Sequence, residues 1–217
     1  MNNTIKVTLT SFEPFGKYKY NPTISVMNNV QSFFENSVNI EITTRILQCK
    51  YSTIKNEVYD IYNENPDIII SLGLRANTSY LNLESIAHNE YSSITPDNDG
   101  ITLSGNKIID SSENLISTID LDKLQILSDK CVDSIVSKNA GKFMCNANFF
   151  WNQYKLNSEK INSKYLFIHI PFTDKYIDLE QEISNNNLPV LKEDNIVRSI
   201  ISIIKNLSKS EENKLEI

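Results

Sequence analysis

The stretch DIIISLG at residues 67–73 decides the fold. It is a short apolar run that follows a proline and ends on a glycine, and three consecutive isoleucines make it apolar on both faces. Strands of this kind are typical of the parallel sheets of α/β proteins, in which helices cover both sides of the sheet. The sequence therefore predicts a buried parallel strand here.

The rest of the chain alternates between strand and helix patterns. Runs of β-branched residues predict strands, and apolar residues spaced three and four apart predict amphipathic helices. Asn21 followed by Pro22 is a typical helix start, because asparagine caps free N–H groups and proline suits the first helical position.

No internal repeat or linker is visible, so we expect residues 1–217 to form one domain with a frayed tail at about 209–217. Strands or extended segments are predicted at 5–11, 40–48, 79–89, 132–137 and 165–172, a hairpin at 101–110 around Ser104-Gly105-Asn106, and helices at 22–34, 52–64, 120–129, 146–157 and after a cap at Asp194.

Composition and charge argue against several classes of function. The chain has 217 residues, 40% of them hydrophobic, and a net charge of −6 without clusters of basic and aromatic residues, which argues against a nucleic-acid partner. The polar N-terminus has no signal pattern, and every apolar run is too short to span a bilayer, so we expect no membrane association. Cys49, Cys131 and Cys145 are an odd number of cysteines without paired spacing, which favours a reducing cytoplasm over a secreted disulfide framework.

The glycines and histidines limit the cofactors that the chain could use. Its five glycines form neither a GxGxxG nor a Walker-type loop, which argues against dinucleotide cofactors and phosphoryl transfer. Two histidines and no CxxC motif argue against zinc. The turn PDNDG at 96–100 resembles the start of a calcium loop but lacks the downstream ligand spacing. We therefore expect no cofactor and no metal, which leaves thiol chemistry.

The stretch NAGKFMCNANFFW at 139–151 carries the clearest sign of such chemistry. A small turn leads to Cys145, and a run with helical character follows it. A cysteine at the start of a helix meets unpaired backbone N–H groups and the positive end of the helix dipole. Both favour the thiolate, and the same N–H groups can hold an oxyanion. The alternative is a buried free cysteine that acts as a small hydrophobe.

A cysteine nucleophile also needs a base, which a carboxylate best orients. His169 lies at the end of the strand predicted at 165–172, on the sheet edge where α/β proteins usually bind ligands. Glu84 and His88 lie on the extended segment at 79–89. A lone glutamate or histidine on such a segment is commonly solvated or simply hydrogen-bonded, so their roles stay open at this point.

The run FEPFG at 12–16 follows the first predicted strand and presents two aromatic residues on a turn. Phe12 and Phe15 form either one wall of a small apolar pocket at this sheet edge or a core anchor for the loop. The residues themselves leave both readings open.

Taken together, five motifs resemble those of the pyroglutamyl peptidase type I family, also called pyrrolidone carboxyl peptidases. They occur in the family's order and cover nearly the whole chain. The motifs are SFEPFGKYKYNPT at 11–23, LESIAHN at 83–89, PDNDG at 96–100, NAGKFMCN at 139–146 and FIHIPF at 167–172. The resemblance implies a cytosolic cysteine peptidase that removes N-terminal pyroglutamate from peptides. The expected fold is an α/β/α sandwich with a central mixed, twisted sheet and helices on both faces.

The resemblance also implies roles for individual residues. Cys145 would be the nucleophile, His169 the base and Glu84 the carboxylate that orients the imidazole. The flat lactam ring of the substrate would lie in an apolar slot, which disfavours a charged N-terminal ammonium. The resemblance gives His88 no catalytic role. The slot would be formed by Phe12, Phe15 and Phe143 together with the backbone at Leu74.

Two departures from the family pattern affect this expectation. Bacterial members commonly have GQAGGR before the glutamate, whereas this chain has GLRANT at 73–78. Bacterial members also place an arginine two residues before the PDN turn, where this chain has Ile94. Loss of one cation near the oxyanion reduces turnover by a factor on the order of 10²–10³. Arg75, in the altered loop, is a candidate substitute.

These departures keep two alternatives open. One is a cysteine hydrolase on the same scaffold with a different N-terminal or lactam specificity, and the other is a catalytically weak oligomeric binding protein. Family resemblance also implies a homotetramer. The sequence assigns no role to Cys49 and Cys131.

Overall fold

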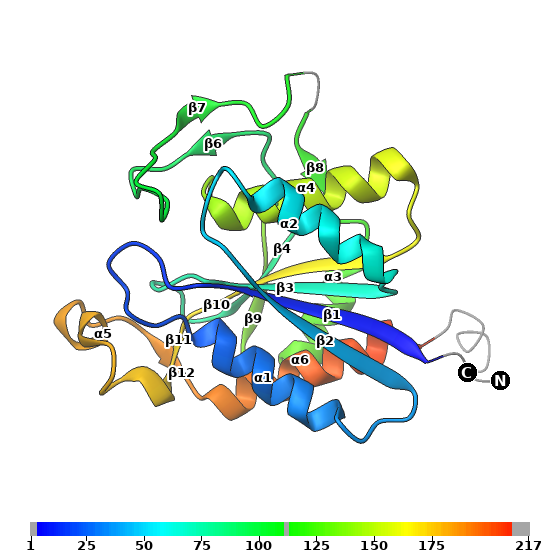
Figure 1. Cartoon of the computed structure of the whole chain (residues 1–217). Coiled ribbons are helices and arrows are strands. Elements are labelled where there is room, and N and C mark those ends of the chain that lie inside the picture. Colours follow the sequence, from blue (N-terminus) through cyan, green and yellow to red (C-terminus); the bar gives the residue numbers. More distant parts are fainter. Residues whose placement is uncertain (1–3, 111–112, 210–217) are drawn as a thin grey trace.

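A six-stranded mixed sheet forms the centre of the protein in the computed structural model, which describes residues 4–110 and 113–209 (Figure 1). The strand order is β2–β1–β3–β10–β4–β9. Neighbouring strands are parallel except β10 and β4, which are antiparallel. The strands are β1 (Ile5–Phe12), β2 (Ile40–Leu47), β3 (Ile68–Leu74), β4 (Leu81–Glu84), β9 (Ser134–Ser137) and β10 (Lys164–Ile170). The stretch at 67–73 therefore forms a fully buried strand in the interior of the sheet, as predicted.

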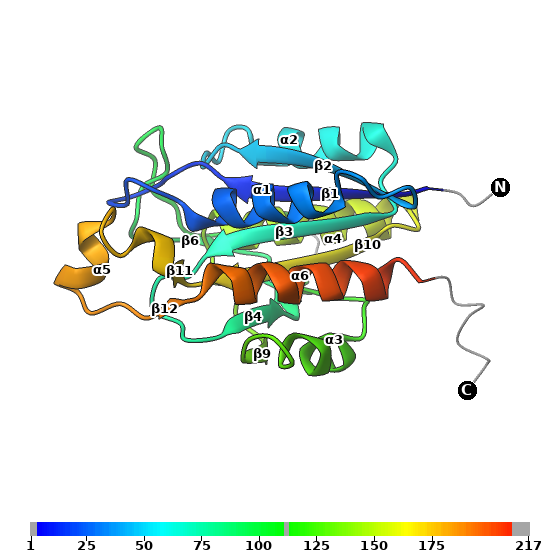
Figure 2. The ribbon, with the colours of Figure 1, turned by 90° about the horizontal axis from the view of Figure 1, so that it is seen from below.

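Helices cover both faces of this sheet, which confirms the α/β/α sandwich. One face is covered by α1, α3 and α6, and the opposite face by α2 and α4 (Figures 1 and 2). Asn21 caps α1 as predicted, and its side chain also donates to the carbonyl of Phe12 at the end of β1 (2.9 Å). The helices are α1 (Pro22–Phe34), α2 (Ile54–Ile61), α3 (Leu121–Ser128), α4 (Met144–Glu159) and α6 (Glu193–Leu207).

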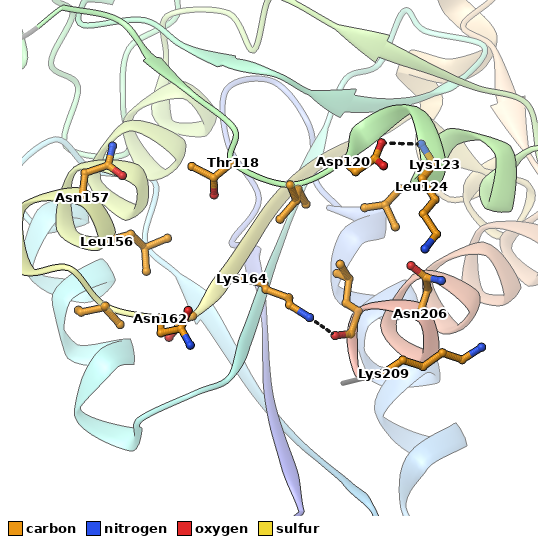
Figure 3. A pocket seen from close by; sticks show the side chains of 14 residues that line it. Thr118, Asp120, Lys123, Leu124, Leu156, Asn157, Asn162, Lys164, Asn206 and Lys209 are labelled. Carbon is orange, nitrogen blue, oxygen red and sulfur yellow. Dashed lines mark hydrogen bonds between the residues drawn. The ribbon is translucent and has the colours of Figure 1, made fainter. Parts of the chain in front are cut away.

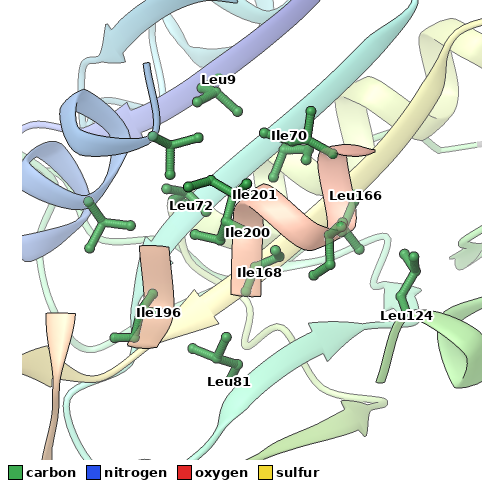
Figure 4. Packing of buried hydrophobic residues seen from close by; sticks show 14 of the residues in the cluster. Leu9, Ile70, Leu72, Leu81, Leu124, Leu166, Ile168, Ile196, Ile200 and Ile201 are labelled. Carbon is green, nitrogen blue, oxygen red and sulfur yellow. The ribbon is translucent and has the colours of Figure 1, made fainter. Parts of the chain in front are cut away.

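The two-residue period of the strands sorts their side chains between two cores. In β10, Leu166 and Ile168 pack beneath α1, α3 and α6, whereas Tyr165 and Phe167 pack against α2 and α4 (Figure 4). Because side chains alternate along a strand, His169 belongs to the α4 face of the sheet. The same alternation in β4 puts Glu84 on that face, since its neighbour Leu83 belongs to the opposite core.

Smaller elements surround the carboxyl end of β10 and the α4 face. Residues 104–106, expected to be a hairpin turn, are instead a strand that pairs with Tyr91–Ser92, so this prediction was wrong. Gly105 does have a positive φ of 73°, but a distant partner strand takes the hydrogen bonds that a local hairpin would use.

The smaller elements around the central sheet are β5 (Ile86–Ala87), β6 (Tyr91–Ser92), β7 (Ser104–Asn106), β8 (Leu115–Ile116), β11 (Phe172–Thr173), β12 (Val190–Leu191), α5 (Gln181–Asn185) and the 3-10 helices η1 (Tyr62–Glu64) and η2 (Asp174–Tyr176).

Two helix starts differ from the sequence prediction. Helix α4 begins at Met144, two residues before the predicted position, so Cys145 lies inside its first turn. Helix α6 begins at Glu193, and Asp194 lies within the helix instead of capping it. The Glu193 N–H donates to the Asp174 carboxylate (2.9 Å), so a residue of η2 caps the start of α6. No sequence pattern near Glu193 predicts this cap.

The tail predicted from about 209 lies almost entirely outside the described residues. Among the residues that are described, no helix combines the length and apolar character needed to cross a bilayer.

We expect Ile200→Ala in α6 to lower the free energy of unfolding by about 2–5 kcal/mol, because it leaves a cavity in the core shown in Figure 4. Urea unfolding followed by circular dichroism measures this change. Ile126→Ala in α3 is the control, since its side chain is 65% exposed and its loss changes stability by about 0.5 kcal/mol or less. Equal effects of the two substitutions would contradict this assignment of the core.

Candidate active site

A buried histidine–carboxylate pair lies on the α4 face of the sheet. Nδ1 of His169 lies 2.8 Å from Oε1 of Glu84, and the two residues are 4% and 0% exposed. Because β10 and β4 are antiparallel neighbours, their side chains approach across adjacent strands. Nδ1–H donates to the carboxylate in this arrangement, so Nε2 is the nitrogen available for proton transfer.

Cys145 lies beside the same imidazole. It is the second residue of α4, directly after the N-cap Phe143 and Met144. A Cβ atom added to Gly73 in β3 would meet His169 Cδ2 at 2.9 Å and Cys145 Sγ at 3.0 Å. The sulfur and the imidazole edge therefore both pack against this one glycine, whose missing side chain leaves room for them.

Cys145 and Glu84 both affect the pKa of His169. Burial lowers the pKa of His169, but charge attraction and hydrogen bonding by the Cys145 thiolate, together with the Glu84 carboxylate, raise it to about 9. The imidazole is therefore held as imidazolium at neutral pH, beside a cysteine at the positive end of a helix. A neighbouring cation and a helix N-terminus are the features that activate a cysteine nucleophile.

The turn before α4 is fixed by its own side chains. The Asn139 side chain accepts from the Gly141 N–H (3.0 Å), and Gly141 has a φ of 74°, a conformation that favours glycine. Asn146, fully buried, accepts from the His88 N–H (2.7 Å) and donates to the carbonyls of His88 (2.8 Å) and Glu90 (3.1 Å). Only the backbone of His88 takes part in these bonds.

Asn146 is a site residue that the sequence analysis missed. It ties the first turn of α4 to the segment after β5, and so helps to fix the position of Cys145. The sequence gives little signal for it, because Asn148, Asn152 and Gln153 of the same helix are buried amides as well.

The predicted pocket aromatics fall into two groups. Phe15 and Phe143 are partly buried, with ring centroids 5.9 Å apart, and Tyr51 packs edge-on against Phe143 at the same distance. Phe12 is only 1% exposed and belongs to the core cluster that contains Cys145. The Leu74 side chain instead packs with a separate cluster. The sequence analysis did not identify Tyr51.

The loop that carries Phe15 is held by polar contacts with distant segments. Oε1 of Glu13 accepts from the Cys49 N–H (2.9 Å) and from the Asn98 amide (2.8 Å), and that amide also donates to the Pro14 carbonyl (3.0 Å). The FEPFG and PDNDG motifs are therefore parts of one structure, although they are far apart in the sequence.

The PDNDG turn uses its first carboxylate for backbone contacts. Asp97 accepts from the N–H groups of Tyr51 (2.9 Å), Asp99 (3.0 Å) and Ile101 (2.8 Å). Across the described part of the chain, no group of three or more His, Cys, Asp and Glu side chains is arranged to hold a metal ion.

The two positions that depart from the family pattern lie in different surroundings. Ile94 is 99% exposed. Nη1 of Arg75 donates to the Asn139 carbonyl (2.9 Å) and lies 3.4 Å from Oε1 of Glu84. Arg75 therefore contacts the carboxylate of the histidine pair.

The other two cysteines have different environments. All three thiols are free. Cys49 is fully buried in the cluster that contains Cys145, and this burial raises the pKa of its thiol and disfavours its thiolate. Cys131 is partly buried.

A cavity of about 530 Å³ lies at the opposite end of β10 and α4 from this site (Figure 3). Lys164, the first residue of β10, donates to the Leu207 carbonyl there (2.6 Å). Asp120 caps α3 by accepting from the Lys123 N–H (3.1 Å). The polar groups of these contacts are thus used within the fold, far from Cys145.

Comparisons with known proteins find relatives that match nearly the whole chain. The chain is 27% identical over 207 residues to the pyrrolidone-carboxylate peptidase of Thermosipho africanus, covering 94% of this chain and 98% of that protein. It is 29% identical over 204 residues to the corresponding protein of Brachyspira hyodysenteriae, with 93% and 98% covered.

Solved structures share the fold. A mutant pyrrolidone carboxyl peptidase from Pyrococcus furiosus matches with a TM-score of 0.84 at 23% identity, covering 94% of this chain and 98% of that one. Pyroglutamyl peptidase I from Bacillus amyloliquefaciens matches with a TM-score of 0.84 at 22% identity, covering 96% and 97%. The pyroglutamyl peptidase family model matches residues 5–210. The chain therefore belongs to the pyroglutamyl peptidase family of cysteine omega-peptidases.

Proposed function

We propose that this protein removes pyroglutamate from the N-termini of peptides, with Cys145, His169 and Glu84 as its catalytic residues. The observation that carries the proposal is the placement of Cys145 at the start of α4, beside an imidazole that is bonded at 2.8 Å to a fully buried carboxylate. In a chain of this family, that arrangement supports nucleophilic catalysis by the thiolate.

The first half of the proposed reaction is acyl transfer to sulfur. The Cys145 thiolate attacks the carbonyl carbon that joins pyroglutamate to the next residue, and a tetrahedral oxyanion forms. The carbon–nitrogen bond then breaks, and the His169 imidazolium gives its proton to the leaving amine. The N–H groups of the first turn of α4 are suitable donors to the oxyanion.

The second half releases pyroglutamate. His169, now neutral, takes a proton from water as the water oxygen attacks the thioester carbon. The carbon–sulfur bond breaks, Cys145 leaves as thiolate, and His169 is again imidazolium. Glu84 keeps its hydrogen bond to Nδ1 through both halves, so it preserves the orientation of the ring and stabilises the imidazolium whenever it forms.

Specificity is assigned to the aromatic groups near the nucleophile. The pyroglutamyl ring is flat and uncharged, so Phe15 and Phe143 can enclose it, with Phe12 beneath them and the Leu74 backbone at the edge. An N-terminal ammonium would lose its hydration there without a partner. A cavity of about 700 Å³ also borders Phe143, and we assign it to the rest of the peptide.

The proposal includes the cytoplasm as the place of action, because three free thiols suit a reducing compartment. Assembly as a homotetramer stays a prediction from the family resemblance.

A related specificity is the second candidate. The fully exposed Ile94 and the altered loop at 73–78 favour it, because both occur where the family pattern differs. A cysteine hydrolase acting on another N-terminal or lactam group would keep the same three catalytic residues.

We expect Cys145→Ser to abolish release of a fluorophore from a pyroglutamyl amide under reducing conditions, because a hydroxyl beside this imidazole is a much weaker nucleophile. Cys131→Ser is the matched control and should retain wild-type turnover. Activity that survives the loss of Cys145 would refute the proposal. Alkylation of Cys145 without pyroglutamyl turnover in the wild-type protein would favour the second candidate.

The pH profile tests the role of Glu84. We expect kcat/KM to fall as the pH rises through about 9, because His169 then loses the proton that the leaving amine needs. In Glu84→Gln the stabilising negative charge is lost, so the pKa of His169 falls and the alkaline limb moves to lower pH by about one unit. Glu64→Gln at the surface should leave the profile unchanged, and an unshifted limb in Glu84→Gln would count against this role.

Gly73→Ala tests the close packing of the site. The added methyl group would meet Cys145, His169 and Phe167 at 2.9–3.0 Å, so one of these side chains must move. We expect kcat to fall by about 10²-fold, since a shift of about 1 Å in reacting groups costs that much. Stopped assays measure the change in kcat, and a thermal melt measures any change in stability. Gly100→Ala is the control without a clash: nothing lies within 4 Å of the added atom, and at a φ of 80° its effect is backbone strain alone, so it should affect stability and leave kcat unchanged.

A further inference from the structure

Arg75 contacts segments that carry all three proposed catalytic residues. Its backbone N–H donates to the carbonyl of Ile170, the residue after His169 (2.8 Å). Its guanidinium donates to the Asn139 carbonyl in the turn that leads to Cys145 (2.9 Å), and it forms an ion pair with Glu84 at 3.4 Å. The loop at 73–78, in which this chain departs from the family pattern, thus supplies a cation that joins these segments.

One oxygen of the Glu84 carboxylate lacks a hydrogen-bond partner among the described residues. Its Oε1 receives the His169 bond and the Arg75 contact, whereas Oε2 is buried and receives no hydrogen bond from the residues that the structure describes. A buried carboxylate that lacks compensation is costly, and a neighbouring cation offsets that cost. Nη1 of Arg75 contacts Oε1, so the guanidinium supplies this compensation through a single charged contact.

We infer that Arg75 is a positioning residue for the proposed reaction, which this inference takes as its basis. Through its contact with Glu84 it keeps the carboxylate aimed at Nδ1 of His169, and through Asn139 it holds the turn that precedes Cys145. Arg75 acts through these groups and does not touch the reacting atoms. The side chain is 35% exposed, so it can be replaced without leaving a cavity in the core.

Turnover of a pyroglutamyl amide is the first test. We expect Arg75→Ala to lower kcat by about tenfold or more while KM stays within about threefold, because the loss concerns orientation of the catalytic groups. Arg75→Lys should recover part of kcat, since it restores the positive charge. Arg45→Ala, which removes a surface arginine paired with Glu64, is the matched control and should behave like the wild type.

Alkylation of Cys145 by iodoacetamide is the second test and needs no substrate. Mass spectrometry follows Cys145 separately from Cys49 and Cys131. Arg75→Ala should slow the labelling of Cys145, because a poorly oriented imidazolium stabilises the thiolate less. Slower labelling would support the inference even if the wild-type protein released no pyroglutamate, an outcome that would refute the proposed function alone.

Two results would overturn the inference. One is Arg75→Ala with kcat and labelling rate both within about twofold of the wild type. The other is Arg75→Ala with a lowered melting temperature and with turnover that added guanidinium, at concentrations well below those that unfold the protein, does not restore. That result would assign Arg75 to folding. Restoration by guanidinium in Arg75→Ala, with no gain in the wild type, supports a positioning role.

Discussion

The hydrogen bond between Glu84 and His169 is the interaction on which the arrangement of this site depends. Both groups are buried, and an isolated charge at either position would be strongly unfavourable. The bond therefore forms only where β4 and β10 are neighbours and where their two-residue periods direct both side chains to the same face. In this sheet β4 and β10 are the one antiparallel pair of neighbours, so the bond spans the place where the strand direction changes.

Gly73 links this pair to Cys145, the proposed nucleophile. It is the register partner of His169 in the adjacent strand β3, and it also lies beneath Cys145. A larger residue there would separate the sulfur from the ring. The apolar run that organises the sheet thus ends on the one residue type that lets helix α4 bring its cysteine close to the strands.

Much of the fold could be predicted from the sequence, because its strands and helices are encoded by local patterns. The run at 67–73 and the Asn21–Pro22 start are examples. Local patterns made Cys145 and His169 candidates, by their places at a helix start and at a strand end. The role of Glu84 and the grouping of positions 84, 145 and 169 came from family motifs, since no local pattern brings these positions together. The strand at 104–106, the Asp174 cap of α6 and the Arg75–Glu84 contact could not be predicted, because each depends on a partner that is distant in the sequence.

Two thiols of one apolar cluster differ in their environments, and this difference supports the proposed role of Cys145. Cys49 and Cys145 belong to the same apolar cluster, so burial among hydrophobic residues does not distinguish them. Cys49 is fully buried, and that burial disfavours its ionised form. Cys145 keeps 8% exposure, lies in the first turn of a helix and faces an imidazolium. The nearest charges and dipoles therefore distinguish the two sulfurs and favour Cys145 as the proposed nucleophile, and they depend on its position at the start of α4.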